Sequence, residues 1–428
     1  MKLIEISKTK FKNFADKSPY ITFHQTKEWA ALKSTNGWHD YYVALEEDGN
    51  ILGAALILSK NIPLINHKIF YSPRGFLIDY NNFTLVEMFT KEIKKFAKDK
   101  KAIFIKIDPY VSYKQRDNDG NIVQGGTDNS KIIDNLKNLG YKHFGFNLMQ
   151  ETLQPRWMHV IDTKDKNLDD VLKDMESKTR QILRKNERCG IKIREIERDE
   201  LPLFKEIMQK TSDRRAFVDR PLTYYENMWD TLHKDGILKI LVASIDFDLY
   251  LENTIKQKDE IAKEMQDRLY KKENNILKMN EKRFQQKQKF DEDEIKRLDK
   301  EIEKIKKYQD DYGHFVYLGS VLFLIYGNEV LSLYGGSIEK FMNFQSAYSL
   351  HYEMIKYAVE NKYKRYNFYG ITGIFNKDNP LYGLYLFKKS FGGVVVELIG
   401  EFDLIVNKPL YYLYKFSYKI YHKIKSKS

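Results

Sequence analysis

The side chains best suited to chemistry lie in one stretch, Phe315–Gly393. Tyr334 stands immediately before two glycines, which would let a substrate approach the backbone closely. Lys388 follows Phe387 in the segment YLFKKSFGG, where we predict a short helix. We therefore expect the catalytic groups here, with Tyr334 and Lys388 as the leading candidates.

Several other kinds of site are excluded by what the sequence lacks. It contains no HExxH, P-loop or GxSxG motif, and its nine histidines show no metal-ligand spacing. Cys189 is the single cysteine, so an internal disulfide and a cysteine-rich metal site are both excluded. We therefore predict no metal site, and a chain that works in a reducing cytoplasm.

The length of the chain limits the number of domains, and its net charge limits the kinds of partner that it can bind. At 428 residues with 42% hydrophobic content, the chain suits two or three packed domains. No window holds about 18 uncharged apolar residues, so we predict no membrane span, and the N-terminus lacks the features of a secretion signal. A net charge of +12 favours an anionic partner, which could be nucleic acid, a phosphorylated substrate or an anionic lipid surface.

The two halves of the chain repeat one order of elements. In the first, YYVALEEDGNILGAALILSK predicts a β-hairpin, followed by a turn at YSPRG, a helix at Phe83–Ala97 and a buried strand at Ala102–Tyr110. The second has a strand pair, a Gly-Gly turn in LYGGS, a helix at Ala347–Asn361 and the strand YKRYNFYG. VVVELIGEFDLIV then closes the chain as one strand. This order suggests the acetyltransferase (GNAT) fold, twice over.

We therefore predict an α/β (α+β) fold with two GNAT-like subdomains. The first covers residues 1–152, with the segment 397–428 packing back on it, and the second covers residues 153–396. Neither half supplies the (R/Q)xxGx(G/A) loop with which that fold cradles the pyrophosphate of CoA.

An inserted arm interrupts the second half. Leu238–Ile245 is typical of the first strand of a hairpin, but its partner arrives only at Phe315. The intervening stretch contains no Gly or Pro, and its apolar residues recur every three, four or seven positions. We predict an antiparallel coiled-coil helical arm at 249–311, with a polar tip at Glu281–Asp293. Its charges could form a solvated face, or the arm could be a lever that touches a large polyanion.

Two further segments are strongly basic. We predict one helix at Leu168–Arg188, which becomes rich in Lys and Arg toward its end. The tail KPLYYLYKFSYKIYHKIKSKS interleaves aromatic residues with lysines at helical spacing. It could pack as a terminal helix with its basic face outward, or lie on an anionic membrane surface.

Taken in order, several segments resemble the FemABX aminoacyltransferases: HQTKEWAALK, FIKIDP, TRQILRKNERCGI, an R-x-x-x-Y pair, LYGGS, YLFKKSFGG and EFDL. The resemblance covers essentially the whole chain, including the arm. It implies a reaction in which aminoacyl-tRNA is the co-substrate, with no further cofactor. The acceptor would be the side-chain amine of the third residue of a peptidoglycan stem peptide, on lipid II or UDP-MurNAc-pentapeptide. Peripheral contact with the inner face of the membrane and the oligomeric state stay open.

The resemblance also implies how the precursor would be held. Lys33 and Arg220 match residues that grip its diphosphate, which suits a lysine point charge and the paired hydrogen bonds of an arginine. Tyr224, one helical turn after Arg220, would face the same groove. The ordinary alternatives are a solvated lysine, a loop salt bridge and a buried aromatic residue, respectively.

The implied catalytic residues are Tyr334, Lys388, Phe387 and Asp108. The Lys388 cation would face the ester carbonyl of the donor and stabilise the oxyanion as the tetrahedral intermediate forms, unless it is simply an exposed lysine. Asp108 matches a residue near the acceptor, although Asp-Pro also simply ends strands. The base could be Asp108 or the substrate itself.

The donor would explain the basic balance of the chain, since tRNA is a polyanion. Its binding surface would include Arg180, Arg184, Lys185 and Arg188, unless these form only a solvated face. Two other functions stay open. One is a CoA-dependent N-acyltransferase on a duplicated GNAT fold, and the other is a non-catalytic nucleic-acid or membrane adaptor that uses the arm.

Overall fold

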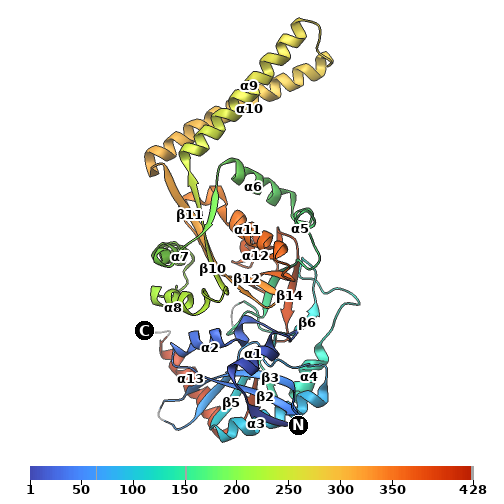
Figure 1. The fold of residues 1–428 in the computed structure, drawn as a ribbon, viewed down its shortest axis with the longest axis vertical. Coiled ribbons are helices and arrows are strands. Elements are labelled where there is room, and N and C mark those ends of the chain that lie inside the picture. The colour runs from blue at the N-terminus through green and yellow to red at the C-terminus, as the bar shows by residue number, and fades with distance from the viewer. Residues whose placement is uncertain (64, 150–151, 426–428) are drawn as a thin grey trace.

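The computed structural model describes residues 1–63, 65–149 and 152–425. Two β-sheets follow one another along the long axis, and a pair of long helices projects beyond the second sheet (Figure 1). Within the described residues, no helix is long and apolar enough to cross a membrane.

The first sheet has seven strands in the order β1-β2-β3-β4-β5-β15-β7. Their bounds are β1 (Lys2–Glu5), β2 (His39–Glu47), β3 (Asn50–Asn61), β4 (Lys68–Ser72), β5 (Ala102–Ile107), β15 (Phe402–Ile405) and β7 (Tyr141–His143). One face packs against α3 (Phe83–Asp99) and α4 (Ser130–Asn138). The other packs against α1 (Lys8–Ala15), α2 (Lys27–Ser34) and α13 (Lys408–Lys425), with the short helix η1 (Phe23–Gln25) before α2.

The second sheet has eight strands in the order β6-β14-β8-β13-β12-β11-β10-β9. Their bounds are β6 (Ser112–Gln115), β14 (Val394–Leu398), β8 (Trp157–Asp162), β13 (Arg365–Ile371), β12 (Glu329–Ser337), β11 (Phe315–Tyr326), β10 (Leu238–Asp246) and β9 (Lys192–Glu195). α7 (Leu201–Arg215) and α8 (Leu222–Leu232) cover one face, and α11 (Ser346–Glu360) covers the other. Outside the arm, the described residues also form α5 (Leu168–Asp174), α6 (Ser177–Arg188), α12 (Tyr382–Lys389), η2 (Arg198–Glu200) and η3 (Glu339–Phe344).

Both sheets share one plan. In the first, β2, β3 and β4 form an antiparallel meander, and β4 then pairs in parallel with β5 after the crossover helix α3. In the second, β10, β11 and β12 form the meander, and β12 pairs in parallel with β13 after α11. The predicted α/β class with two GNAT-like units is confirmed.

The C-terminal strand prediction is wrong in one respect. VVVELIGEFDLIV is not one strand, because β14 belongs to the second sheet and β15 to the first. The chain turns between them at Gly400, whose φ of +95° lies in the left-handed region that glycine tolerates. Since β6 also joins the second sheet from the first half, the two sheets exchange strands, and a single hydrophobic cluster contains Trp29 and Leu56 together with Phe204 and Leu322.

The expected Gly-Gly turn is also wrong. Gly335 and Gly336 lie inside β12, opposite Val321 and Ser320 of β11. A Cβ on Gly336 would lie 2.6 Å from Thr211 Oγ1 and 3.0 Å from the Ile207 carbonyl oxygen. The glycine therefore permits helix α7 to approach the strand closely.

The arm consists of α9 (Phe247–Glu273) and α10 (Glu281–Tyr312), which run side by side in opposite directions (Figure 1). The strands at its base pair as predicted, from Leu238 opposite Leu324 to Asp246 opposite Phe315. The predicted tip is wrong, because the turn lies at 274–280 and Glu281–Asp293 is helical. That polar segment belongs to the seam, where the buried Asp291 pairs with Arg268 of α9 at 2.7 Å.

The basic segment Leu168–Arg188 is two helices rather than one. α5 ends at Asp174 and α6 begins at Ser177, because Met175 is extended, with φ −71° and ψ 147°. Arg180 closes this break: its Nη1 donates to the carbonyl oxygens of Leu172 at 3.1 Å and Lys173 at 3.3 Å.

Candidate active site

The ammonium of Lys388 is held beneath strand β13. Its side chain is 7% exposed, and Nζ donates to the carbonyl oxygens of Phe368 and Gly370, both at 2.7 Å. No carboxylate among the described residues pairs with it. Burial lowers the pKa of Lys388 to about 7. The alternative of an exposed lysine is therefore wrong.

Aromatic rings surround this lysine. Phe387 lies 5.3 Å from His351 and 5.4 Å from Phe391 between ring centroids. Burial, together with the Lys388 charge, lowers the pKa of both His159 and His351 to about 3, so both rings are neutral near pH 7. The neighbouring Lys389 instead forms an ion pair with Asp119. Lys388 therefore occupies an enclosed, largely apolar position.

Strand β13 has a bulge at the point where Lys388 binds it. Tyr369 lies between the two bound carbonyls, has a φ of +61°, and falls within the register shift between β13 and β8. The backbone N–H of Tyr369 donates to Asn367 Oδ1 at 2.7 Å. Its hydroxyl donates to Gln154 Oε1, and its pKa is raised by burial. The bulge thus places a half-buried tyrosine beside Gln154.

Tyr334 connects Tyr369 to two other tyrosines. Its ring lies 6.5 Å from that of Tyr224 and 5.9 Å from that of Tyr225. The pKa of Tyr224 is raised by burial and by its interaction with Tyr334. Tyr334 is also close enough to Tyr369 to contribute to the raised pKa of Tyr369. The predicted residues Tyr224 and Tyr334 therefore lie together.

Two cations face each other next to these tyrosines. Lys33, at the end of α2, holds its Nζ 4.0 Å from the ring centroid of Trp29, and Arg220 holds its Cζ 5.4 Å from that of Tyr224. The pKa of Lys33 is lowered to about 8, first by burial and then by the Arg220 charge. Neither forms an ion pair with a carboxylate of the described residues. Two neighbouring cations without a counter-charge are candidates for binding an anion.

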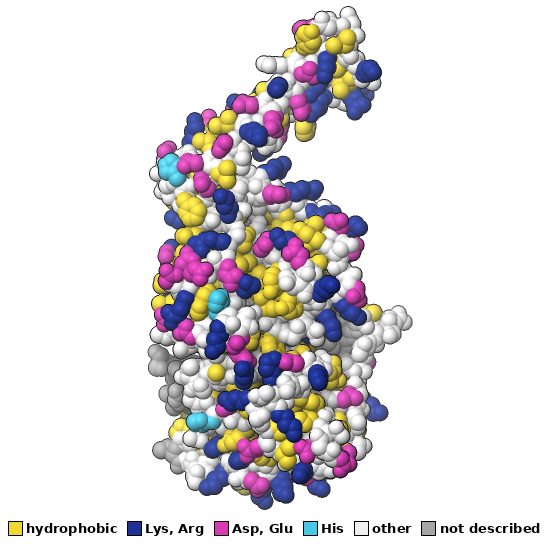
Figure 2. Space-filling model, viewed as in Figure 1, with side chains coloured by type: hydrophobic (Ala, Val, Ile, Leu, Met, Phe, Trp, Pro, Cys, Tyr) yellow, Lys and Arg dark blue, Asp and Glu magenta, His cyan; other side chains and the backbone are white. Residues whose placement is uncertain are grey.

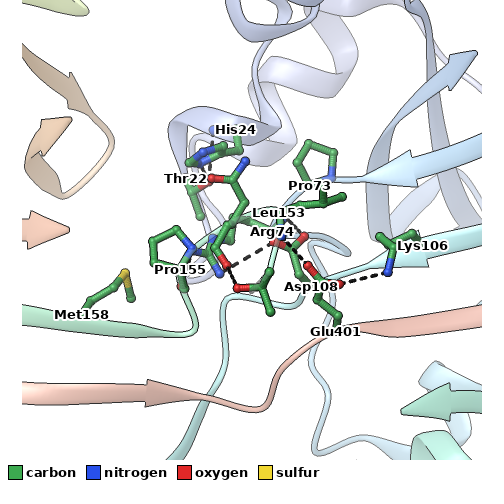
Figure 3. A network of polar contacts seen from close by, with 12 residues as sticks. Thr22, His24, Pro73, Arg74, Lys106, Asp108, Leu153, Pro155, Met158 and Glu401 are labelled. Carbon is green, nitrogen blue, oxygen red and sulfur yellow. Dashed lines mark hydrogen bonds and ion pairs between the residues drawn. The ribbon is translucent and has the colours of Figure 1, made fainter. Parts of the chain in front are cut away.

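Asp108 holds the loop after β4 (Figure 3). Its Oδ1 accepts from the backbone N–H of Arg74 at 2.8 Å, and its Oδ2 lies 3.7 Å from Arg74 Nη1. Arg74 Nη2 in turn donates to the Pro155 carbonyl at 2.8 Å. Burial raises the pKa of Asp108 to about 6, although the Arg74 charge opposes this. The structure therefore places Asp108 in contact with Arg74. Arg74 in turn lies close enough to Tyr369 for its charge to affect the pKa of that tyrosine.

Sequence reasoning missed three residues of this region: Arg74, Tyr369 and His24. His24 is buried, and its pKa is lowered by burial and then by the charges of Arg74 and Lys33. The arginine of YSPRG was a visible signal, because a charged residue at a turn beside a buried strand needs a partner. Tyr369 gave no signal, since its bulge depends on Lys388.

The predicted tRNA surface lies on α6 and shares no residue with the group around Lys388 and Tyr334. Arg184, Lys185 and Arg188 are exposed on α6, whereas Arg180 is half-buried and engaged with the end of α5. Lys185 and Arg188 border a pocket of about 760 Å³ between α6 and the base of the arm. On the arm itself, basic, acidic and hydrophobic side chains are interspersed (Figure 2). Three of the four predicted residues are therefore free to meet a polyanion.

Comparisons with known proteins agree with one another. Residues 6–419 match the model of the FemAB family. The chain is 33% identical to aminoacyltransferase FemA of Staphylococcus aureus strain bovine RF122 / ET3-1, over 99% of this chain and 100% of that protein, and the same figures hold for strain NCTC 8325 / PS 47. A crystal structure of FemX superimposes with a TM-score of 0.79 and 29% identity, covering 96% of this chain and 99% of that one.

Proposed function

The chain belongs to the FemAB family and is an aminoacyltransferase, and on this premise we propose that it moves an amino acid from aminoacyl-tRNA to a peptidoglycan precursor. The acceptor is the side-chain amine of the third stem-peptide residue, on lipid II or UDP-MurNAc-pentapeptide. The amine nitrogen attacks the ester carbonyl, the ester C–O bond breaks, and the ribose oxygen leaves with a proton that comes from the amine. The product contributes to an interpeptide bridge.

The observation that carries the proposal is the pair of cations Lys33 and Arg220, neither of which has a carboxylate partner among the described residues. A precursor of either kind contains a diphosphate, whose oxygens would accept hydrogen bonds from both cations. The two residues come from α2 and from the loop before α8, which belong to different halves of the chain. Binding would therefore draw on both halves and neutralise two charges that otherwise repel each other.

Tyr224, Tyr334 and Tyr369 form a run of hydroxyl-bearing rings that starts at Arg220. We place the stem peptide along this run. Rigid aromatic rings suit this purpose, because they offer contact area and a hydroxyl at little cost in side-chain entropy. Asp108 supports this surface by fixing Arg74.

Lys388 would act at the other end of the run. An ammonium has three N–H donors, and two of them bind the carbonyls of β13. The third is available for the oxyanion that forms on the donor ester. Phe387 and its aromatic neighbours keep the surroundings of this donor apolar, which strengthens its interaction with a developing charge.

The donor, aminoacyl-tRNA, is negatively charged and would bind to basic faces of the chain. Arg184, Lys185 and Arg188 would bind tRNA phosphates, and binding should weaken as salt is raised. Aminoacyl-tRNA serves as a co-substrate, and the proposed reaction requires no other cofactor or metal. The proposed place of action is the cytoplasm, at or near the inner face of the membrane, where both acceptors are available.

A transfer assay tests this proposal. The purified protein is mixed with a pool of tRNAs charged with radiolabelled amino acids, and with either lipid II or UDP-MurNAc-pentapeptide. We expect label on at least one acceptor and loss of that label with Arg220→Ala. Unlabelled acceptors, in the presence of a folded protein and intact charged tRNA, would rule the proposal out.

A further inference from the structure

Helix α13 has two apolar sides, and the protein covers only one. On the inner side Tyr411 is fully buried, with its ring 5.4 Å from that of Phe104 in β5, and Leu410 and Tyr414 pack beside it. The Tyr411 hydroxyl and Lys415 Nζ both bind Asp403, at 2.9 Å and 2.8 Å. The helix is therefore firmly attached to the first sheet, and its other side is presented in a fixed orientation.

The outer side carries large apolar residues. Tyr412 is 58% exposed, Leu413 59%, Phe416 65% and Ile420 44%. Positions 412, 416 and 420 recur at intervals of four, so they form one stripe along the helix, with Leu413 adjoining it. A stripe of this size on a helix that is already packed is not needed for folding.

The charge of the segment is entirely positive. Residues 408–428 contain six lysines and neither Asp nor Glu. Within the described part of the segment, Lys408 and Lys419 are exposed and lack a carboxylate partner, while Lys415 is bound to Asp403. A second copy of the chain is a poor occupant, because a two-fold contact through this helix would set lysines against lysines. Nucleic acid would satisfy the lysines and leave the apolar stripe uncovered.

An anionic lipid surface satisfies both features. Apolar and aromatic side chains enter the boundary between headgroups and acyl chains, while lysines remain among the anionic headgroups. We propose that α13 binds the surface of an anionic phospholipid bilayer through Tyr412, Leu413, Phe416 and Ile420, with Lys408 and Lys419 at the headgroups.

This placement has a consequence for the active site, which rests on the proposed function. Ile69 and Tyr71 of β4 are two residues apart and so point to one face of the first sheet. Ile69 packs with the α13 cluster, and Tyr71 packs with the cluster that contains α2. The helix on the membrane and the helix that carries Lys33 therefore cover the same face, which suits an acceptor whose diphosphate is held at a bilayer.

The test is vesicle flotation without any substrate, so it does not depend on the transfer reaction. The full-length protein is mixed with vesicles of phosphatidylcholine alone or of phosphatidylcholine with phosphatidylglycerol. We expect binding to the anionic vesicles, weakened by salt, and a loss of about tenfold or more in the Leu413→Glu/Phe416→Glu double variant. Phe290→Glu, at a residue of the arm that is 63% exposed, is the matched control and should bind as the wild type does.

Three outcomes would overturn the proposal: no binding to anionic vesicles, equal loss in Phe290→Glu, or a wild-type dimer that the double variant dissociates. Thermal unfolding of the variants checks that they are folded. A final experiment distinguishes a failure of this proposal from a failure of the proposed function. The double variant should transfer at the wild-type rate to an acceptor outside a bilayer, either UDP-MurNAc-pentapeptide or lipid II in detergent micelles, and should lose rate only with lipid II in vesicles.

Discussion

The ammonium of Lys388 binds the two backbone carbonyls that flank Tyr369, one from Phe368 and one from Gly370. A cation from α12 therefore holds the bulge in β13, and the hydroxyl of Tyr369 at this bulge donates to Gln154. The two residues are coupled, since a change at Lys388 removes a charge and also releases the backbone that holds Tyr369.

Lys388→Met should lower the rate of transfer by about 10²–10³-fold, because it removes a positioned oxyanion donor. Methionine is close in size, so the fold should survive. The comparison is with Lys389→Met, which breaks only the surface ion pair to Asp119 and should have little effect. Tyr369→Phe should cost less than Lys388→Met. Equal losses would mean that Lys388 acts only by positioning Tyr369.

The affinity for the diphosphate should depend on pH through Lys33. Its pKa is about 8 in the free protein, and a bound anion favours the protonated form and so raises that pKa. Above about pH 8, binding must therefore take up a proton, and the Kd should rise by up to about tenfold per pH unit. Calorimetry with UDP-MurNAc-pentapeptide measures this. Lys33→Arg, which stays charged, should remove the dependence; if the dependence persists, another group is responsible.

Asp108 should make stability depend on pH with an unusual sign. Its pKa is about 6 in the folded protein against an ordinary value of 3.8, so the folded state holds the proton more tightly. Its contribution to stability is therefore present at low pH and is lost as the pH rises from about 4 to about 6, by about 3 kcal/mol. Urea unfolding of wild type and Asp108→Asn at both ends of that range measures the effect. A difference that does not change with pH would show that Asp108 is not buried as described.

Gly336→Ala should destabilise the protein by about 1–3 kcal/mol, because the added methyl group would meet Thr211 and the backbone carbonyl of Ile207. Gly383→Ala is the matched control, since a methyl group there meets nothing within 4 Å. It should be neutral or slightly stabilising in α12. Denaturant unfolding distinguishes the two, and similar values would argue against the close contact of α7 with β12.

If the arm carries tRNA, shortening it should weaken tRNA binding while the body stays folded. The cut must spare its base, because Phe247, Tyr250 and Ile305 belong to a buried cluster with Phe344. Residues 262–294 can be replaced by a short Gly/Ser link, since α9 and α10 lie side by side along this length. Filter binding with charged tRNA gives the affinity. An unchanged affinity would show that the arm does not bind tRNA and would indicate another partner for it.

The sequence predicted most of the helices, strands and turns that depend on short-range patterns. The strand pattern at Leu238–Ile245 identified β10 as the hairpin partner of β11 although the whole arm separates them. A hairpin turn at Asp48 and Gly49 identified β2 and β3. Patterns failed where a distant contact decides the outcome. The polar residues of Glu281–Asp293 suggested a loop, but Asp291 is matched by Arg268 on the other helix.

The residues of the candidate site also fall into those that the sequence predicted and those that it did not. Lys33, Arg220, Tyr224 and Tyr334 were found through their motifs, and the structure brings them together. Arg74 and Tyr369 were missed because their roles arise from three-dimensional contacts, with Asp108 in one case and with the carbonyls bound by Lys388 in the other. The arginine of YSPRG indicated a charge that needs a partner without indicating which one, and local sequence carries no information about the contact at Tyr369.

The most direct test of the central claim is mass spectrometry of the acceptor after incubation with aminoacyl-tRNA and, separately, with acetyl-CoA. Lipid II and UDP-MurNAc-pentapeptide are each supplied with the third-residue side-chain amine either free or chemically acetylated. We predict a gain of one or more amino acid residues from aminoacyl-tRNA on the free amine, and no gain on the blocked one. Acetyl transfer from CoA, or aminoacylation of the blocked acceptor, would contradict the account.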